Sequence, residues 1–214
     1  MTKSSNSGLW KHGLLLTMLF GFTVMLVGGA YIYKTRAPIP AAVTDNAGNV
    51  LFTAQDIQAG QELFRKRNLM NYGSVLGHGA YLGPDYTAEA LHTMTLAMQA
   101  DRSNGRFDTL SLGDQAGINA EIAHELKINR YRESDGNLVF TPGQAKGFAS
   151  LVDQYTRTFT AGQPERSLTA NTLIPLKEGG ANAAVSREAA RQMSAFVTWT
   201  AWLSVAKRPE ANHS

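Results

Sequence analysis

Residues 14–33, LLLTMLFGFTVMLVGGAYIY, run for twenty positions without a charged side chain. A helix of this length rises about 30 Å, which matches the hydrocarbon core of a bilayer. Tyr31 and Tyr33 stand where an aromatic belt meets the membrane surface. The apolar core of a cleaved signal peptide is shorter, about 7–15 residues. The sequence therefore predicts a retained transmembrane helix over 14–33 rather than a signal peptide.

The charges around this span do not fix its orientation. Lys3 and Lys11 precede it, and Lys34 and Arg36 follow it, so the positive-inside count is a tie. A short tail before the span and a long remainder after it are typical of an uncleaved N-terminal anchor. We therefore expect residues 1–13 to be a cytoplasmic tail and the bulk of the chain to lie on the other side.

The composition excludes several function classes. Lys and Arg number 20 against 17 Asp and Glu, a formal charge of +3, and no segment concentrates basic residues as a nucleic-acid surface requires. Hydrophobic residues make up 43% and charged residues 17%, which excludes disorder of the whole chain. Cysteine is absent, and this excludes disulfides, iron–sulfur clusters, zinc–thiolate sites and thioether-attached haem.

The rest of the chain is predicted to be a mainly α-helical domain over 50–206 with a small β-hairpin. It follows a linker over 34–49, where Pro38 and Pro40 favour extended chain, and it ends in a polar tail at 207–214. The Asp-Gly pair near 135 predicts the hairpin turn. Good N-cap residues predict where the helices begin. These helices are expected over 53–68, 86–100, 114–129, 141–159 and 187–206.

The residues show no catalytic constellation by themselves. The five histidines (His12, His78, His92, His124 and His213) include no pair at helical ligand spacing, and the acidic pairs Asp56/Glu62 and Glu121/Glu125 have the pattern of helix surface. His92 is expected to be partly buried. Glycines at 73, 77, 79 and 83 instead predict a structured loop, and such loops often carry function.

Two segments resemble a known enzyme family. GSVLGHGAYLGPDYTAEALH at 73–92 resembles the N-terminal extramembrane region of single-chain quinol-dependent nitric oxide reductases. SREAARQMSAFVTWTAWLSVAKRP at 186–209 resembles the segment just before their catalytic membrane domain. The resemblance covers nearly the whole chain, and it implies one transmembrane helix followed by a cytochrome c-like globular domain.

The resemblance also implies that this domain lacks haem. The related cytochrome c subunit has the pattern C-x-x-C-H followed by G-E-G-A-Y. Counting back from Gly79 places the two cysteines and the histidine on Leu69, Tyr72 and Gly73, none of which can hold haem. Leu69, Met70 and Tyr72 are expected to fill the space that haem would take, because cores are close-packed. His78 stands where the cytochrome has an acid.

The function implied by the resemblance is a part of a quinol-dependent nitric oxide reductase, which reduces two NO to N2O and water. This chain would have no catalytic metal ligands and would cap a multi-helix membrane domain or subunit that holds haem b and non-haem iron. Whether it is a separate subunit, the product of a split gene or a truncated chain stays open. It would be a single-pass protein of the bacterial inner membrane, in contact with lipid, with its bulk in the periplasm. The alternative is a membrane-anchored interaction or scaffold module without an enzyme.

The resemblance finally suggests an interface with the catalytic part. The Gly79 carbonyl and the Tyr81 hydroxyl would contribute to a shared calcium site, with carboxylates supplied by the partner or by haem propionates. The expected partner-facing residues are His78, Gly79, Ala80, Tyr81, Trp199 and Trp202. From the residues alone, a tight turn with Tyr81 packed on the domain is the preferred alternative. Plain core packing of the two tryptophans is as well supported as their place in an interface.

Overall fold

The computed structural model describes residues 6–35, 37–80, 82–174 and 186–207. The chain divides into two compact units, Met1–Pro38 and Ile39–Ser214. The first unit is the helix α1 (Asn6–Thr35). Among the described residues, its segment Gly8–Lys34 is the one helix long and apolar enough to cross a membrane. The helix begins earlier than predicted and includes much of the expected polar tail.

Within α1, the polar side chains of two threonines are satisfied by the helix itself. The hydroxyl of Thr17 donates to the carbonyl of Gly13 at 3.0 Å, and that of Thr23 donates to the carbonyl of Leu19 at 2.8 Å. A hydroxyl bonded in this way does not stay unpaired in hydrocarbon. Both threonines are therefore compatible with a membrane-spanning helix.

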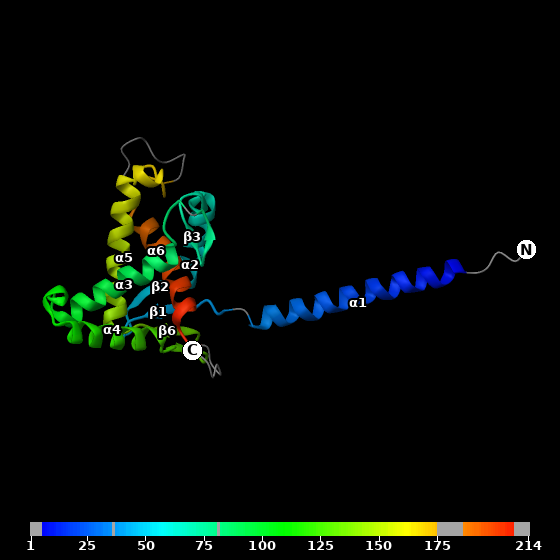
Figure 1. The fold of residues 1–214 in the computed structure, drawn as a ribbon, viewed down its shortest axis with the longest axis horizontal. Coiled ribbons are helices and arrows are strands. Elements are labelled where there is room, and N and C mark those ends of the chain that lie inside the picture. Colours follow the sequence, from blue (N-terminus) through cyan, green and yellow to red (C-terminus); the bar gives the residue numbers. More distant parts are fainter. Residues whose placement is uncertain (1–5, 36, 81, 175–185, 208–214) are drawn as a thin grey trace, which may run out of the picture. The chain divides into compact units, whose positions relative to one another are not determined.

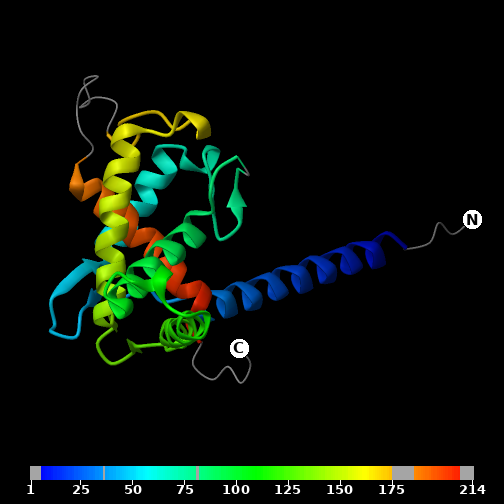
Figure 2. The ribbon, with the colours of Figure 1, turned by 60° about the vertical axis from the view of Figure 1, so that its left-hand side comes forward.

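The described part of the second unit is mainly helical, with two small sheets (Figures 1 and 2). Within these described residues, three short 3-10 turns lie between its longer helices. The helices are α2 (Ala54–Lys66), α3 (Tyr86–Ser103), α4 (Leu112–Lys127), α5 (Pro142–Ala161) and α6 (Arg187–Val205), and the turns are η1 (Leu69–Asn71), η2 (Phe107–Thr109) and η3 (Pro164–Arg166).

Side-chain caps explain where these helices begin. Thr53 starts α2 and Thr141 starts α5, each in a capping box with an acceptor three residues later. Asp85 and Ser186 cap α3 and α6. These helix starts confirm the predictions, since capping depends on a few neighbouring residues.

The larger sheet corrects the predicted linker. Its order is β2 (Val50–Thr53), β1 (Ala42–Thr44), β6 (Asn137–Val139) and β5 (Tyr131–Arg132), and β5 and β6 form the predicted hairpin. Strand β1 pairs antiparallel with β2 and parallel with β6. Val43 is fully buried there. Residues 42–44 of the expected linker therefore form an inner strand of the domain, paired on both sides.

The core lies between the helices, and a glycine lies at the point of contact in two of the helix pairs. A Cβ built on Gly60 of α2 would lie 2.0 Å from the backbone oxygen of Gln192 in α6. A Cβ on Gly147 of α5 would lie 2.9 Å from the Cα of Met94 in α3. Both views show α5 crossing α3 and lying beside α6 (Figures 1 and 2). Glycine thus allows the closest approach of the helix pairs that enclose the core.

Candidate functional site: a glycine ribbon and the pocket beside it

The glycine-rich segment 73–85 folds into a two-stranded ribbon, which we call the glycine ribbon. Strands β3 (Ser74–Val75) and β4 (His78–Gly79) pair antiparallel across a two-residue turn. The turn residues Leu76 and Gly77 have φ of 52° and 77°, the geometry of a type I′ turn. A residue with a Cβ is disfavoured there by about 1–2 kcal/mol. The predicted structured loop is confirmed, but its strand pair was not predicted.

Asp85, the N-cap of α3, holds the ribbon in this shape. Its Oδ2 accepts hydrogen bonds from the Gly77 N–H at 2.7 Å and the Ser74 hydroxyl at 2.8 Å. Its Oδ1 accepts the Ala88 N–H at 3.0 Å. Partial burial alone would raise the pKa of Asp85, but these hydrogen bonds outweigh it and hold the pKa below the usual 3.8. The carboxylate is therefore charged at neutral pH and fixed in place.

A chain of hydroxyls connects the ribbon to α6. The Leu76 N–H donates to Thr87 Oγ1 at 3.1 Å, and Thr87 Oγ1 lies 3.0 Å from Thr200 Oγ1. The Thr200 hydroxyl donates to the Val197 carbonyl at 2.9 Å, so the Thr87 hydroxyl must be the donor to Thr200. Both threonines are buried. The turn of the ribbon is thus tied to the last helix through the core.

Three glycines of the ribbon are required by close backbone contacts. A Cβ on Gly83 would lie 1.6 Å from the Tyr72 carbonyl oxygen. A Cβ on Gly79, whose φ is +144°, would lie 2.3 Å from the Gly73 carbonyl oxygen, and a Cβ on Gly73 would lie 2.4 Å from that of Pro84. Any side chain at these positions would force the ribbon open.

The ribbon and the turn before it expose apolar side chains. Met70 is 47% exposed, Leu76 is 48% and Leu82 is 83%. His78 is exposed too, with its Nδ1 3.0 Å from the Leu76 carbonyl oxygen. Ala80 is pinned beside them, because its N–H donates to the Met70 carbonyl at 2.8 Å. A rigid surface with exposed apolar side chains has the character of a contact site.

Two residues of this ribbon, Gly79 and Tyr81, are the expected calcium ligands. Tyr81 lies outside the described residues, whereas Gly79 lies in β4. Asp85 is the acidic residue of the segment 73–85, and both of its oxygens already accept hydrogen bonds. Ca²⁺ needs six to eight oxygen ligands. The described part of the ribbon therefore does not form a calcium site without oxygens from a partner.

The residues at the expected haem-attachment positions do not fit haem. Leu69 is fully buried in the core. Gly73 has no side chain, and a Cβ there would lie 2.8 Å from the ring of Tyr86. Tyr86 is itself buried and contacts Phe64 edge to face at 5.8 Å between ring centroids. An aromatic ring thus occupies the space that an axial side chain at position 73 would need.

The other two residues expected to fill this space differ in their burial. Tyr72 is half-buried and packs against the core. The prediction for Met70 is wrong, because this side chain points outward and is 47% exposed. Met70 lies in η1, and its neighbour Leu69 takes the inward position of that turn. A one-turn helix has one inward side, so both residues cannot fill the same space.

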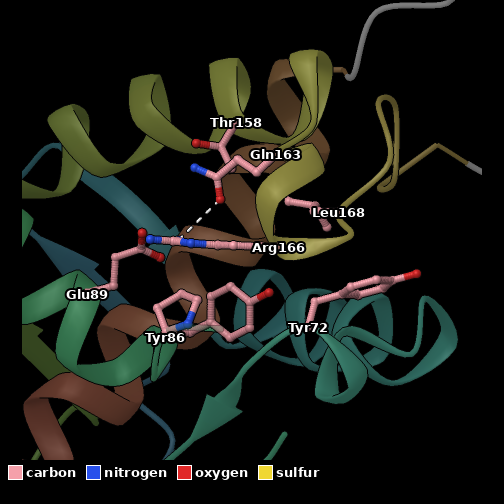
Figure 3. Close-up of a pocket in the computed structure, with 8 residues that line it drawn as sticks. Tyr72, Tyr86, Glu89, Thr158, Gln163, Arg166 and Leu168 are labelled. Carbon is pink, nitrogen blue, oxygen red and sulfur yellow. Dashed lines mark hydrogen bonds between the residues drawn. The ribbon is translucent and has the colours of Figure 1, made fainter. Parts of the chain in front are cut away.

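A small pocket lies beside Tyr72 and Tyr86, between the ribbon side of the domain and η3 (Figure 3). Its volume of about 10 Å³ holds about one water molecule. Glu89 lies on its wall and accepts hydrogen bonds from the Gln154 side chain at 3.2 Å and the Tyr155 hydroxyl at 3.3 Å. In Figure 3 the guanidinium of Arg166 points toward the Glu89 carboxylate.

Burial raises the pKa of Glu89, although the Tyr155 hydroxyl and the charge of Arg166 oppose the shift. Burial also raises the pKa of Tyr86 and of Tyr155 well above 10.0. Both tyrosines therefore stay neutral at physiological pH; Tyr86 lines the pocket, and Tyr155 donates its hydroxyl to Glu89 from behind it. Among the described residues, no group of three or more His, Asp or Glu side chains could hold a metal ion.

The two tryptophans differ in their surroundings. Trp202 is 9% exposed, and its ring lies 6.0 Å from that of Tyr131. Trp199 is half-buried and packs on Phe196 at 6.3 Å. The burial of Trp202 favours the core-packing alternative for that residue, whereas Trp199 reaches the surface.

Two acidic groups that the sequence suggested were surface residues are largely buried. Asp56 completes the capping box of α2 and binds Arg191 of α6 through both oxygens, at 2.7 and 3.0 Å. The side chain of Glu125 is 15% exposed and contacts Arg102 and Thr141. Single-helix patterns cannot reveal these roles, because the partners come from distant segments.

Two further histidines of the domain lie on helices α3 and α4. His92 and His124 are exposed, so the expected partial burial of His92 is wrong. The prediction followed from its apolar neighbour Leu91, but adjacent helix positions face different directions. His213 lies outside the described residues.

Comparison with known proteins supplies a family for this fold. The family model that describes the NorB cytochrome c-like domain of nitric oxide reductase matches residues 40–214. None of the curated proteins compared with the chain matches it significantly. The matched region includes both the glycine ribbon and the last helix.

Proposed function

Since the chain belongs to the family of the NorB cytochrome c-like domain of nitric oxide reductase, we propose that it is the haem-free extramembrane part of a quinol-dependent nitric oxide reductase. The complete enzyme would reduce two NO to N2O and water with two electrons from quinol and two protons. Haem b, non-haem iron and the quinol site would lie in a catalytic multi-helix membrane part. This chain would cap that part and carry none of its catalytic ligands.

The absence of haem is supported by chemistry and by packing. The chain has no cysteine, so it cannot attach haem through thioethers. The ring of Tyr86 lies where a side chain at position 73 would extend. The full chain, purified alone, is expected to show no Soret absorption band. A stoichiometric haem signal would contradict this part of the proposal.

The single observation that carries the docking role is the glycine ribbon. It is rigid, it is tied to α6 through Thr87 and Thr200, and it exposes Leu76 and Leu82. We assign the interface with the catalytic part to this ribbon, including His78, Gly79, Ala80 and Tyr81, together with Trp199. If calcium binds there, the Gly79 carbonyl and the Tyr81 hydroxyl would be this chain's ligands. Trp202 belongs to the core instead.

A matched pair of substitutions tests this role. Leu82 on the ribbon and Leu112 at the start of α4 are each 83% exposed. Leu82→Asp would place an unpaired charge in the interface, which costs several kcal/mol when desolvated. Leu112→Asp adds the same charge at a helix N-terminus, where it is favourable. Both variants should fold as the unaltered chain does.

The measurement is co-purification in detergent with the catalytic membrane part, followed by haem and iron analysis of the complex. Leu82→Asp should reduce recovery of the partner at least tenfold, and Leu112→Asp should not. Equal recovery with both variants would remove the ribbon from the interface. If no iron-containing partner co-purifies with the unaltered chain, the scaffold alternative is the better description.

The proposed location follows from α1. This helix would anchor the chain in the bacterial inner membrane, with the domain in the periplasm and the N-terminal end in the cytoplasm. Protease added outside spheroplasts should therefore digest the domain. Protection of the domain until the membrane is opened would reverse the orientation.

A further inference from the structure

A second pocket lies inside the domain, lined by residues of α3, α4, α5 and α6. Leu91, Met94 and Leu126 form its apolar wall, and Gln144, Thr198 and Trp202 contribute polar atoms. Its volume is about 10 Å³, about the space that one water molecule requires. Nothing larger fits without moving the helices.

Two polar atoms on its wall have no partner among the described residues. These are the hydroxyl oxygen of Thr198 and the indole nitrogen of Trp202, which lie one turn apart on α6. The residues are only 1% and 9% exposed. Leaving such groups unpaired is unfavourable, and native cores rarely do so. Two orphaned groups on one small pocket point to an occupant that bonds to both.

The chemistry of the two groups selects this occupant. An indole N–H can only donate, whereas a threonine hydroxyl can both donate and accept. Gln144 is buried, and its Oε1 accepts the Thr141 N–H at 3.0 Å, so its NH2 group is a further donor on the wall. A water molecule can accept from Trp202 and donate to Thr198. An apolar gas molecule would leave both groups unpaired.

We propose that this pocket holds one buried water molecule, bonded to Thr198 Oγ1 and Trp202 Nε1. The water gives hydrogen-bond partners to these two buried groups of α6. It makes the C-terminal half of the last helix a hydrated contact rather than a purely apolar one. This proposal does not depend on the function of the protein.

Thr198→Val tests the proposal, because the sign of its effect depends on whether the pocket is occupied. With water present, the change removes a bond and leaves the water short of a partner, so the unfolding equilibrium constant of the full chain in detergent should rise about fivefold to tenfold. With an empty pocket, the change removes an unpaired buried hydroxyl, and the same constant should fall. A fall or no change would overturn the proposal.

Thr156→Val on α5 is the matched control. Its hydroxyl donates to the Val152 carbonyl of its own helix at 2.7 Å, so the same change should alter the constant less than about twofold. A crystal structure of the full chain with ordered solvent gives a second readout. Density for one water within hydrogen-bond distance of both atoms is expected. An empty pocket, or an apolar additive in it, would overturn the proposal even if Thr198→Val is destabilising.

Discussion

Replacing Leu76 with asparagine should leave the stability of the chain almost unchanged, although it removes a large apolar side chain. Leu76 is 48% exposed, so losing its buried half costs about 1 kcal/mol. Its φ of 52° lies in the left-handed region, where a leucine is disfavoured by about 1–2 kcal/mol and asparagine is readily accommodated. The two effects oppose each other. We expect a net change within about 0.5 kcal/mol.

Leu96→Asn is the matched control for this prediction. Leu96 is 49% exposed and lies inside α3, so the transfer cost is the same as for Leu76. Asparagine is also a poorer helix former than leucine by about 0.5 kcal/mol, so this variant should lose about 1.5 kcal/mol.

The assay is urea unfolding of the full chain in detergent, followed by circular dichroism and by the fluorescence of the domain. The two variants should differ by about 1.5 kcal/mol in free energy of unfolding. Equal losses would refute the reasoning, because they would show that the ribbon turn is not strained at Leu76. Leu76→Asn should also weaken association with the catalytic part, since the exposed apolar side chain is lost.

Glu89→Gln should flatten the pH dependence of the free energy of unfolding above pH 4.5. In the unaltered chain the pKa of Glu89 is raised, so the folded state keeps a proton that the unfolded state releases, and glutamine removes this difference. The unaltered chain should then lose stability as pH rises from 4.5 through that raised pKa, and an equal slope in both proteins would contradict this. Gly60→Ala should lower the free energy of unfolding by about 1–2 kcal/mol in thermal unfolding, because the new Cβ would lie 2.0 Å from the backbone oxygen of Gln192 and the cost of overpacking exceeds the gain in helix propensity. A more stable variant would mean that α2 and α6 separate easily. Thr141→Ala should lower the free energy of unfolding by about 1–2 kcal/mol because it removes the N-cap of α5, whereas Thr141→Ser keeps a capping hydroxyl and should retain most of the stability. Equal losses for the two variants in urea unfolding would argue against the cap.

The helices were predictable because their signals are local. Thr53, Thr141 and Ser186 cap the helices that the sequence suggested, since a cap needs only the next three residues. Strand β1 was not predictable in this way. Val43 pairs with Leu138 of the hairpin, and a single sequence gives no sign of that distant partner.

The candidate site was predictable in outline only. Glycine spacing indicated a structured segment, but a leucine in a left-handed turn is unusual, so the ribbon was not expected. The roles of Asp56 and Glu89 were missed because they depend on burial against other helices. Their own helices carry no signal that distinguishes a buried carboxylate from an exposed one.

Contacts between the beginning of the domain and its later elements have a consequence for how the domain folds during synthesis. Strand β1 needs β6 on one side, and the buried face of α2, with Ile57 and Phe64, packs against α6. Contacts so distant in sequence form slowly. During synthesis, the N-terminal half of the domain must wait with its apolar face uncovered until α6 has emerged. A chain stalled before residue 187 should therefore be a substrate for chaperones and proteases.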